Sequence, residues 1–171
     1  MGETPVARLA LDSIDHRILA ILQKEGRLSN QDLADRVALS PAPCLRRVRA
    51  LEKAGVIRQY AALLNPRKVG LGMMSFVTVK LEKQGKMPAE AFARAVQTWP
   101  EVVSCYSMTG ETDYFLRIFV EDLDHYTRFL MDRLLKQAGV VDVKSNIVLE
   151  AIKDTTALPL DQVNPGRRKR G

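Results

Sequence analysis

The sequence lacks the residues and motifs that commonly mark an enzyme. It contains 2 histidines and 2 cysteines in 171 residues, and it has no HExxH, GxSxG or P-loop pattern. His16 and His125 stand apart from each other, so we expect a capping or surface role for each. Cys44 and Cys105 have no metal-ligand spacing, and we expect both to be reduced and buried. The sequence therefore predicts a protein that is not an enzyme and holds no metal.

Long apolar runs are absent as well. No stretch of about 18 residues is apolar enough for a transmembrane helix, and no signal peptide or lipidation motif is present. We therefore expect a cytoplasmic protein without a membrane partner. Its 171 residues are enough for two small domains.

Basic residues exceed acidic ones, and the excess lies at the two ends of the chain. The formal net charge is +6. Residues 1–60 hold 10 basic and 7 acidic side chains, residues 61–160 hold 12 of each, and residues 161–171 hold 4 and 1. The first excess suits nucleic-acid binding, because lysine and arginine neutralise phosphates. The final segment, GRRKRG, either adds salt-sensitive affinity for DNA or only aids solubility.

Residues 30–55 predict two short helices joined by a tight turn at Leu39 and Ser40. Ser40 is a natural N-cap whose hydroxyl can accept a free backbone N–H, and Pro41 fits the first helical position. Gly55 then supplies a stop. An amphipathic pattern over residues 11–29 predicts one further helix ahead of the pair. Three helices around one small core, two of them closely joined, predict a helix-turn-helix domain.

The second helix of the pair has one apolar and one cationic side. At about 100° per residue, the buried arc consists of Cys44, Leu45, Val48 and Leu51. The opposite side combines small residues with arginines, whose planar forks can contact a guanine edge or a phosphate. A cationic helix face can also be merely solvated. With the helix-turn-helix context, we predict these DNA-binding residues: Ser29, Asn30, Ser40, Ala42, Pro43, Arg46, Arg47, Arg49, Ala50 and Lys53.

A short strand or wing is predicted after Gly55, where β-branched and aromatic residues gather. Asn65 and Pro66 end it, and glycines punctuate the residues that follow. We therefore predict a DNA-binding domain at 1–64, a linker at 65–72, a second domain at 73–153 and a flexible basic tail at 154–171.

The second domain has the pattern strand, helix, strand, strand, helix, strand. The predicted elements are 73–82, 88–99, 101–109, 113–122, 122–139 and 140–153, with a compact turn at 110–112. This order predicts a ferredoxin-like βαββαβ domain, in which both helices cover one face of a four-stranded antiparallel sheet, so the chain is of the α+β class. The other face would expose Phe76, Phe115 and Phe119. A second subunit is the simplest cover, and we expect an obligate dimer.

The residues just described resemble the Lrp/AsnC family. The run LDSIDHRILAILQKEGRLSNQDLADRVALSPAPCLRRVRALEKAGVIRQYAALLNP resembles the family's N-terminal half, and SPAPCLRRVRALE is its most specific segment. TGETDY resembles the glycine-and-aspartate turn of the family's effector domain, and the likeness spans about residues 11–153. It implies a transcription regulator that binds double-stranded DNA, with no cofactor but an amino-acid effector such as leucine. It also implies a homo-oligomer, a dimer that often forms an octamer of four dimers.

The resemblance implies that the turn at 109–113 binds the effector. An amino acid needs a carboxylate for its ammonium group and N–H or O–H donors for its carboxylate. Asp113 can supply the first, and the backbone N–H groups of Gly110 and Thr112 or the Thr112 hydroxyl can supply the second. Alternatively, the turn is only a hairpin in which Gly110 adopts a positive φ. The predicted effector residues are Met108, Thr109, Gly110, Glu111, Thr112, Asp113 and Tyr114.

Two other functions fit the same architecture. The two-domain architecture also resembles that of siroheme decarboxylases, in which a related fold would bind a tetrapyrrole through histidine, arginine and an apolar cavity. His125 is the single histidine of the second half, and the arginines of the predicted recognition helix are intact, so the regulator is favoured. A weakly specific architectural DNA-binding protein is the third possibility, and it would show a steep salt dependence with little sequence preference.

Overall fold

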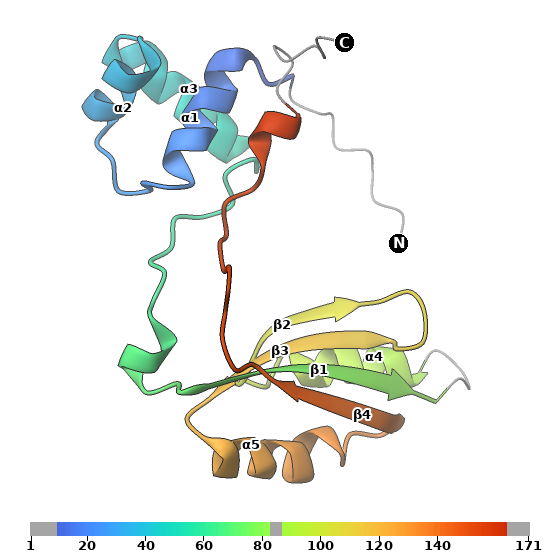
Figure 1. The fold of residues 1–171 in the computed structure, drawn as a ribbon. Coiled ribbons are helices and arrows are strands. Elements are labelled where there is room, and N and C mark those ends of the chain that lie inside the picture. Colours follow the sequence, from blue (N-terminus) through green and yellow to red (C-terminus); the bar gives the residue numbers. More distant parts are fainter. Residues whose placement is uncertain (1–9, 83–86, 164–171) are drawn as a thin grey trace, which may run out of the picture. The chain divides into compact units, whose positions relative to one another are not determined.

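The chain folds into two units, a helical bundle and a helix-covered sheet (Figure 1). The computed structural model describes residues 10–82 and 87–163. The first unit consists of Met1–Ala62 together with Lys153–Gly171, and the second of Leu63–Ile152. The predicted α+β class and element order are confirmed.

Three helices form the first unit: α1 (Ser13–Leu22), α2 (Asn30–Val37) and α3 (Pro41–Lys53). The side chain of Asp12 accepts hydrogen bonds from the backbone N–H groups of Ile14 and Asp15, and the Asp15 carboxylate accepts from the Asp12 N–H. This reciprocal capping box fixes the start of α1. Ala38 takes a left-handed φ of 57°, which turns the chain sharply between α2 and α3.

Ser40 is the N-cap of α3, but its hydroxyl makes no capping hydrogen bond. The prediction of such a bond was wrong, and the reason lies in the next three residues. An N-cap hydroxyl accepts from the second or third helical N–H, and the third position here is Pro43, which has none. Pro41 occupies the first helical position as predicted.

The core of the first unit takes side chains from all three helices. Its buried members are Ile18, Leu19, Leu33, Ala34, Val37, Cys44, Val48 and Leu51. Burying a Leu, Ile or Val side chain contributes about 1.5–3 kcal/mol. The apolar side of α3 is therefore fixed inside the bundle, which leaves its other side outward.

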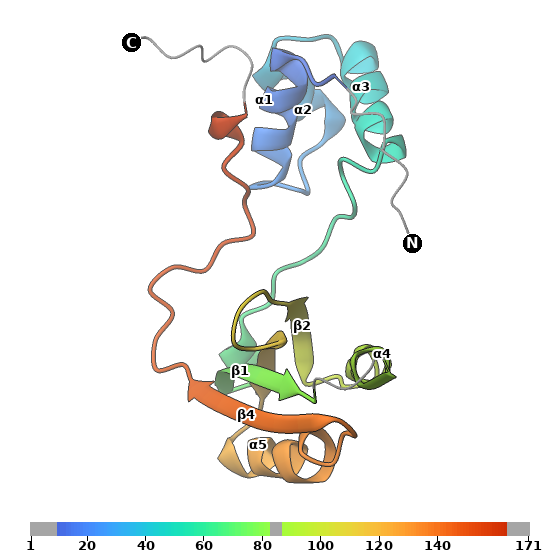
Figure 2. The same cartoon turned by 90° about the vertical axis from the view of Figure 1, so that its right-hand side faces the viewer.

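The C-terminal segment returns to the first unit. A 3-10 turn, η3 (Leu160–Gln162), lies beside α1 in both views (Figures 1 and 2). The Gln23 side chain donates to the carbonyl oxygen of Leu158 over 3.1 Å and accepts from its N–H over 2.9 Å. Leu160 packs against the helical core. Leu158 and Leu160 of the predicted flexible tail thus contact the first unit. Residues 164–171 of that tail lie outside the described residues.

The second unit is a four-stranded antiparallel sheet with two helices. Its elements are β1 (Met73–Leu81), α4 (Met87–Val96), β2 (Val102–Ser107), β3 (Tyr114–Val120), α5 (Leu123–Phe129), the π-helical continuation η2 (Leu130–Leu134) and β4 (Val140–Ile147). The strand order is β2-β3-β1-β4. In the register, Val77 of β1 lies opposite Leu116 of β3 and Ser145 of β4. The predicted βαββαβ topology is confirmed.

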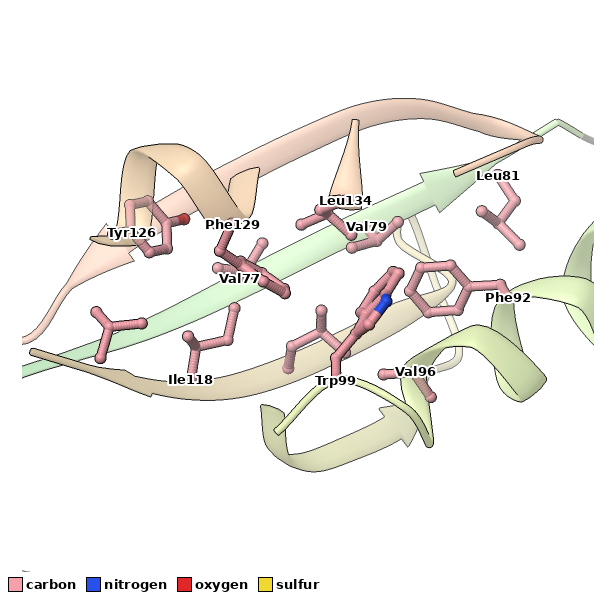
Figure 3. Close-up of a cluster of buried hydrophobic side chains, with 12 residues drawn as sticks. Val77, Val79, Leu81, Phe92, Val96, Trp99, Ile118, Tyr126, Phe129 and Leu134 are labelled. Atoms are coloured by element: carbon pink, nitrogen blue, oxygen red, sulfur yellow. The ribbon is translucent and has the colours of Figure 1, made fainter. Parts of the chain in front are cut away.

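Both helices of this unit pack on the same face of the sheet. Figure 3 shows Phe92 and Val96 from α4 and Tyr126 and Phe129 from α5 around side chains of the strands. Trp99 joins the two sides, because its ring meets Phe92 edge-on at 5.9 Å and Phe129 edge-on at 5.6 Å. Such edge-to-face pairs add about 0.5–1.5 kcal/mol each beyond the burial of their area.

The other face of the sheet carries the three predicted phenylalanines. Because successive side chains alternate between faces, Phe76, Phe115 and Phe119 lie opposite the buried core residues. The rings of Phe76 and Phe115 stack at 5.2 Å, and the guanidinium carbon of Arg117 lies 5.8 Å from the Phe119 ring. These side chains are only half-buried.

Two predicted strands differ in the structure: the final strand is shorter than predicted, and the wing strand after Gly55 is not formed. The final strand was predicted to reach residue 153, but β4 ends at Ile147. Its neighbour β1 begins at Met73, so the last ladder bond is from the Val148 N–H to the Met74 carbonyl. Residues 58–65 have no helix or strand assignment. The predicted wing strand has no partner strand within the described part of this chain.

Candidate DNA-binding and effector-binding sites

The outward side of α3 is cationic and accessible. Arg46, Arg49 and Lys53 are exposed, while Cys44 and Leu51 of the same helix are buried. Within residues 10–82 and 87–163, none of these three cations forms a salt bridge with an acidic side chain. Three positive charges are thus available to an external anion on one helix face.

Arg47 differs from the other arginines of α3, because it is engaged inside the unit. Its guanidinium donates to Asp15 over 2.8 Å and forms a second salt bridge with Asp12, also at 2.8 Å. The hydrogen bond to Asp15, which has the largest effect, and that to Asp12 raise the pKa of Arg47. The structure therefore gives this predicted phosphate contact a second role, which is to hold α3 against the start of α1.

The predicted residues ahead of α3 lie at the helix-helix turn. Ser29 caps α2 by accepting from the Asp32 N–H, and its hydroxyl donates to the Asp32 carboxylate over 2.6 Å. Asn30 donates from its side chain to the carbonyl of Pro41 over 2.9 Å, which ties α2 to the beginning of α3. Ser29 and Ser40 are exposed. Small residues surround the cations: Ala42 and Ala50 are exposed, and Pro43 is half-buried.

The predicted effector turn joins β2 to β3. Its members Met108, Thr109, Gly110 and Glu111 are exposed, and Thr112 is half-buried. Gly110 has the positive φ, 113°, that the hairpin interpretation requires, so a side chain at this position would be strained. A bond from the Met108 N–H to the Asp113 carbonyl, 2.8 Å long, closes the turn.

Asp113 anchors this turn to β1. Its backbone N–H donates to the Val79 carbonyl, and its carboxylate oxygen Oδ2 accepts from the Leu81 N–H over 2.7 Å. The second carboxylate oxygen, Oδ1, has no hydrogen-bond partner among the residues that the structure describes. One oxygen of Asp113 is therefore structural, and the other is open to a ligand.

Tyr114 does not join the exposed surface of the turn. Its ring lies 4.7 Å from that of Phe92, and its hydroxyl donates to the Ala89 carbonyl over 3.4 Å. Burial raises its pKa. The period of two explains this position, because Tyr114 shares its face with the buried Leu116.

A polar cluster around the buried Glu101 in the second unit was not predicted from the sequence. Glu101, at the start of β2, accepts from Arg133 of η2 at 2.9 and 3.1 Å, and the ring of His125 lies 3.4 Å away. The partners are 24 and 32 positions apart, so no local pattern marks them. His16 is also buried, which contradicts the predicted capping or surface role.

The described residues contain no group of His, Cys, Asp and Glu side chains that could hold a metal ion. Cys44 is buried and Cys105 half-buried, and both are free thiols whose pKa is raised by burial. No helix in the described part of the chain is long and apolar enough to cross a membrane.

Two family models match the chain, one for each half. Residues 11–58 match a winged helix-turn-helix DNA-binding domain, and residues 74–158 match the Lrp/AsnC ligand-binding domain. The second match contains the turn at 108–114, and the first contains α3.

Curated relatives and solved structures agree with these matches. The leucine-responsive regulatory proteins of Escherichia coli K12 and Salmonella typhimurium are each 42% identical over 148 residues, which is 86% of this chain and 90% of theirs. A Neisseria meningitidis transcriptional regulator, crystallised as an L-Met complex, superposes with a TM-score of 0.87 and 51% identity, covering 90% of this chain and 99% of that one. An AsnC family regulator from Agrobacterium tumefaciens superposes with a TM-score of 0.84 and is 40% identical in sequence, covering 89% of this chain and 99% of that one.

Proposed function

Because the chain belongs to the Lrp/AsnC family of transcriptional regulators, we propose that the exposed face of α3 enters the major groove of operator DNA. The observation that carries this proposal is the set of three exposed cations that have no acidic partner among the described residues. The major groove admits an α-helix and presents a distinct pattern of donors and acceptors for each base pair. The domain at residues 1–64 binds DNA, and the linker at 65–72 connects it to the effector domain.

Each side chain of this face has a role that follows from its chemistry. Arg46 and Arg49 contact base edges or phosphates through their guanidinium forks, and Lys53 neutralises phosphate. Hydroxyls and amides at the helix-helix turn donate to the DNA backbone, and small residues allow the groove to approach. These further contacts are Ser29, Asn30, Ser40, Ala42, Pro43 and Ala50. Arg47 positions α3 through Asp15 and can reach a flanking phosphate only by leaving that pair.

The turn at 108–113 binds an amino acid. The free oxygen of Asp113 receives the ammonium group, and the N–H groups of Gly110 and Thr112 or the Thr112 hydroxyl receive the carboxylate. Met108 forms a wall for the side chain, with Thr109 and Glu111 at the edge, and Tyr114 supports the turn from the core. The relatives support an apolar side chain, that of leucine or methionine, because one is a leucine-responsive regulatory protein and another was crystallised with L-Met.

The protein acts as a cytoplasmic dimer or a larger assembly of dimers, up to an octamer. The half-buried aromatic face of the sheet supports the dimer, because an isologous contact would remove Phe76, Phe115 and Phe119 from water. A ligand that bridges two dimers favours one assembly over another and so changes the array of recognition helices. By linkage, DNA that prefers the ligand-bound assembly must tighten ligand binding by the same factor.

Fluorescence anisotropy with a DNA duplex selected by the protein tests the proposal. Arg46→Ala should weaken binding by about 1–3 kcal/mol if Arg46 reads a base. The matched control is Arg94→Ala, which removes an exposed arginine from α4 of the other unit. Wild-type affinity for Arg46→Ala would count against the groove-facing placement of α3.

A further inference from the structure

The chain passes between its two units twice. The first passage is the linker, because the first unit ends at Ala62 and the second begins at Leu63. The second passage lies in residues 148–163, called the C-terminal segment below, because the chain rejoins the first unit at Lys153. One linker is enough to join two domains, so the second passage adds a restraint between them.

The C-terminal segment is held at the end of α1 by two hydrogen bonds and an apolar contact. Gln23, the C-cap of α1, bonds through its side-chain amide to both backbone groups of Leu158, over 3.1 and 2.9 Å. Leu160 is half-buried on the helical core, and η3 can be followed beside α1 in Figures 1 and 2. Leu158 itself is 68% exposed, so the two bonds compete with water and the contact can open without unfolding the bundle.

The linker is attached near the same end of α1. The Tyr60 hydroxyl donates to the Glu52 carboxylate of α3 over 3.0 Å. The Tyr60 ring covers Gly26, where an added Cβ would lie 3.6 Å from a ring carbon. Gly26 follows Gln23 by three positions in the sequence. Both passages are therefore fastened to the first unit at the C-terminal end of α1.

The two passages also begin together in the second unit. The Val148 N–H, at the start of the C-terminal segment, donates to the carbonyl of Met74 over 2.9 Å, next to the point where the linker enters β1. The other end of β1 holds the candidate effector turn, because Asp113 bonds to the Val79 carbonyl and the Leu81 N–H. One strand thus connects the effector turn to the start of both passages.

We propose that the C-terminal segment is a second tether, whose docking on α1 couples effector binding to DNA binding. The inference rests on the proposed effector and DNA sites. The residues between Val148 and Leu158 reach at most about 35 Å when fully extended, so a docked segment limits the orientations of the DNA-binding unit. An undocked segment leaves that unit on the linker alone. Docked and undocked are the two states that a ligand bonded to β1 through Asp113 can bias.

A double variant that opens the docking contact tests the proposal in the full-length protein. Gln23→Ala removes both side-chain bonds to Leu158, and Leu160→Ala removes most of the apolar contact. Saturating leucine or methionine, whichever the wild type binds, should change the wild-type Kd for the selected DNA duplex by about fivefold or more. In the double variant this factor should fall to about one. Titration calorimetry should still show the amino acid binding to it, because neither residue belongs to the effector turn.

The matched control is the double variant Gln97→Ala with Val163→Ala. Gln97 is an exposed glutamine whose side chain forms no hydrogen bond within the described part of the chain, and Val163, directly after η3, is 65% exposed. This variant should keep the wild-type factor. Circular dichroism should show wild-type helix content for both double variants, which separates loss of coupling from loss of fold.

The Leu158 N–H reports docking directly, because it donates to Gln23. Its hydrogen-exchange rate in the wild type should change by about fivefold or more when the amino acid binds. The tether is overturned, with the two sites intact, if the Gln23 and Leu160 variant keeps the wild-type factor or if the exchange rate at Leu158 does not respond. A wild type that binds neither amino acid would instead refute the effector site of the proposed function, and the coupling with it.

Discussion

Arg47 of α3 donates to the carboxylate of Asp15 at the start of α1 over 2.8 Å, across 32 positions of sequence. Asp15 also completes the capping box of α1 by accepting from the Asp12 N–H. The capping of one helix and the orientation of another thus depend on a single, largely buried carboxylate. This link fixes where the free cations of α3 point.

Removing the Arg47 charge should destabilise the first unit. Arg47→Met keeps much of the aliphatic stem but leaves Asp15 buried without its cationic partner, which costs about 1–3 kcal/mol. We expect a lower Tm in calorimetry and weaker DNA binding as a consequence. Arg46→Met is the control, since Arg46 has no described salt bridge, and it should weaken DNA binding at unchanged Tm. Equal Tm values for the wild type and Arg47→Met would contradict the positioning role.

The stabilisation that the charged Asp12 carboxylate gives to the folded protein should decrease at acidic pH. The N–H of Asp15 and the guanidinium of Arg47 lower the pKa of Asp12 in the folded protein. Because this pKa is lower in the folded than in the unfolded state, the Asp12 charge stabilises the folded protein. The stabilisation is complete above the pKa of the unfolded state, about 3.9, and is lost as the pH falls through the pKa of the folded state. Asp12→Asn can still cap the helix but carries no charge.

The Tm difference between wild type and Asp12→Asn should therefore be constant near neutral pH and shrink below about pH 4. Differential scanning calorimetry across this range measures it. A difference that does not change on acidification would show that Asp12 acts through its capping bonds alone.

Gly139→Ala should destabilise the second unit through both backbone strain and a steric clash. Gly139 has a φ of 86°, and an added Cβ would lie 2.6 Å from the Cβ of Pro88. Gly55 has a similar φ of 70° with no atom within 4 Å, so Gly55→Ala reports the strain without the clash. The strain itself costs about 1 kcal/mol or more. Chemical denaturation should give a larger loss for Gly139→Ala, and equal losses would mean that Pro88 moves away freely.

The effector assignment predicts a charge effect at Asp113 without a loss of fold. Asp113→Asn retains an oxygen that can accept from the Leu81 N–H, but it removes the negative charge offered to an ammonium group. Isothermal titration with leucine and with methionine should show binding to wild type and at least tenfold weaker binding to the variant. Glu90→Gln, which neutralises an exposed carboxylate on α4 outside the turn, serves as the control. Unchanged affinity for Asp113→Asn would leave the turn as a simple hairpin.

Periodicity predicted the elements well, because the apolar faces of helices and strands are local patterns. It placed Cys44, Val48 and Leu51 inside and Arg46 and Arg49 outside, as the structure has them. Contacts between distant residues were not predictable in this way.

The missed features all depend on such distant contacts. We predicted a phosphate contact for Arg47 because its partners, Asp12 and Asp15, lie far from it in the sequence, at the start of α1. His16 was predicted to lie at the surface, but it is buried in the helical bundle. The early end of β4 follows from where β1 begins, and the sequence of β4 alone does not contain that limit.

Selection of bound duplexes from a random DNA pool tests the central claim, that α3 reads sequence. The full-length protein should enrich a defined motif, and anisotropy should show binding to that motif about a thousandfold tighter than to a shuffled duplex of the same composition. Arg46→Ala should reduce this preference. Enrichment of no motif, with equal affinities for the two duplexes and only a steep dependence on salt, would contradict the account and identify an architectural DNA-binding protein.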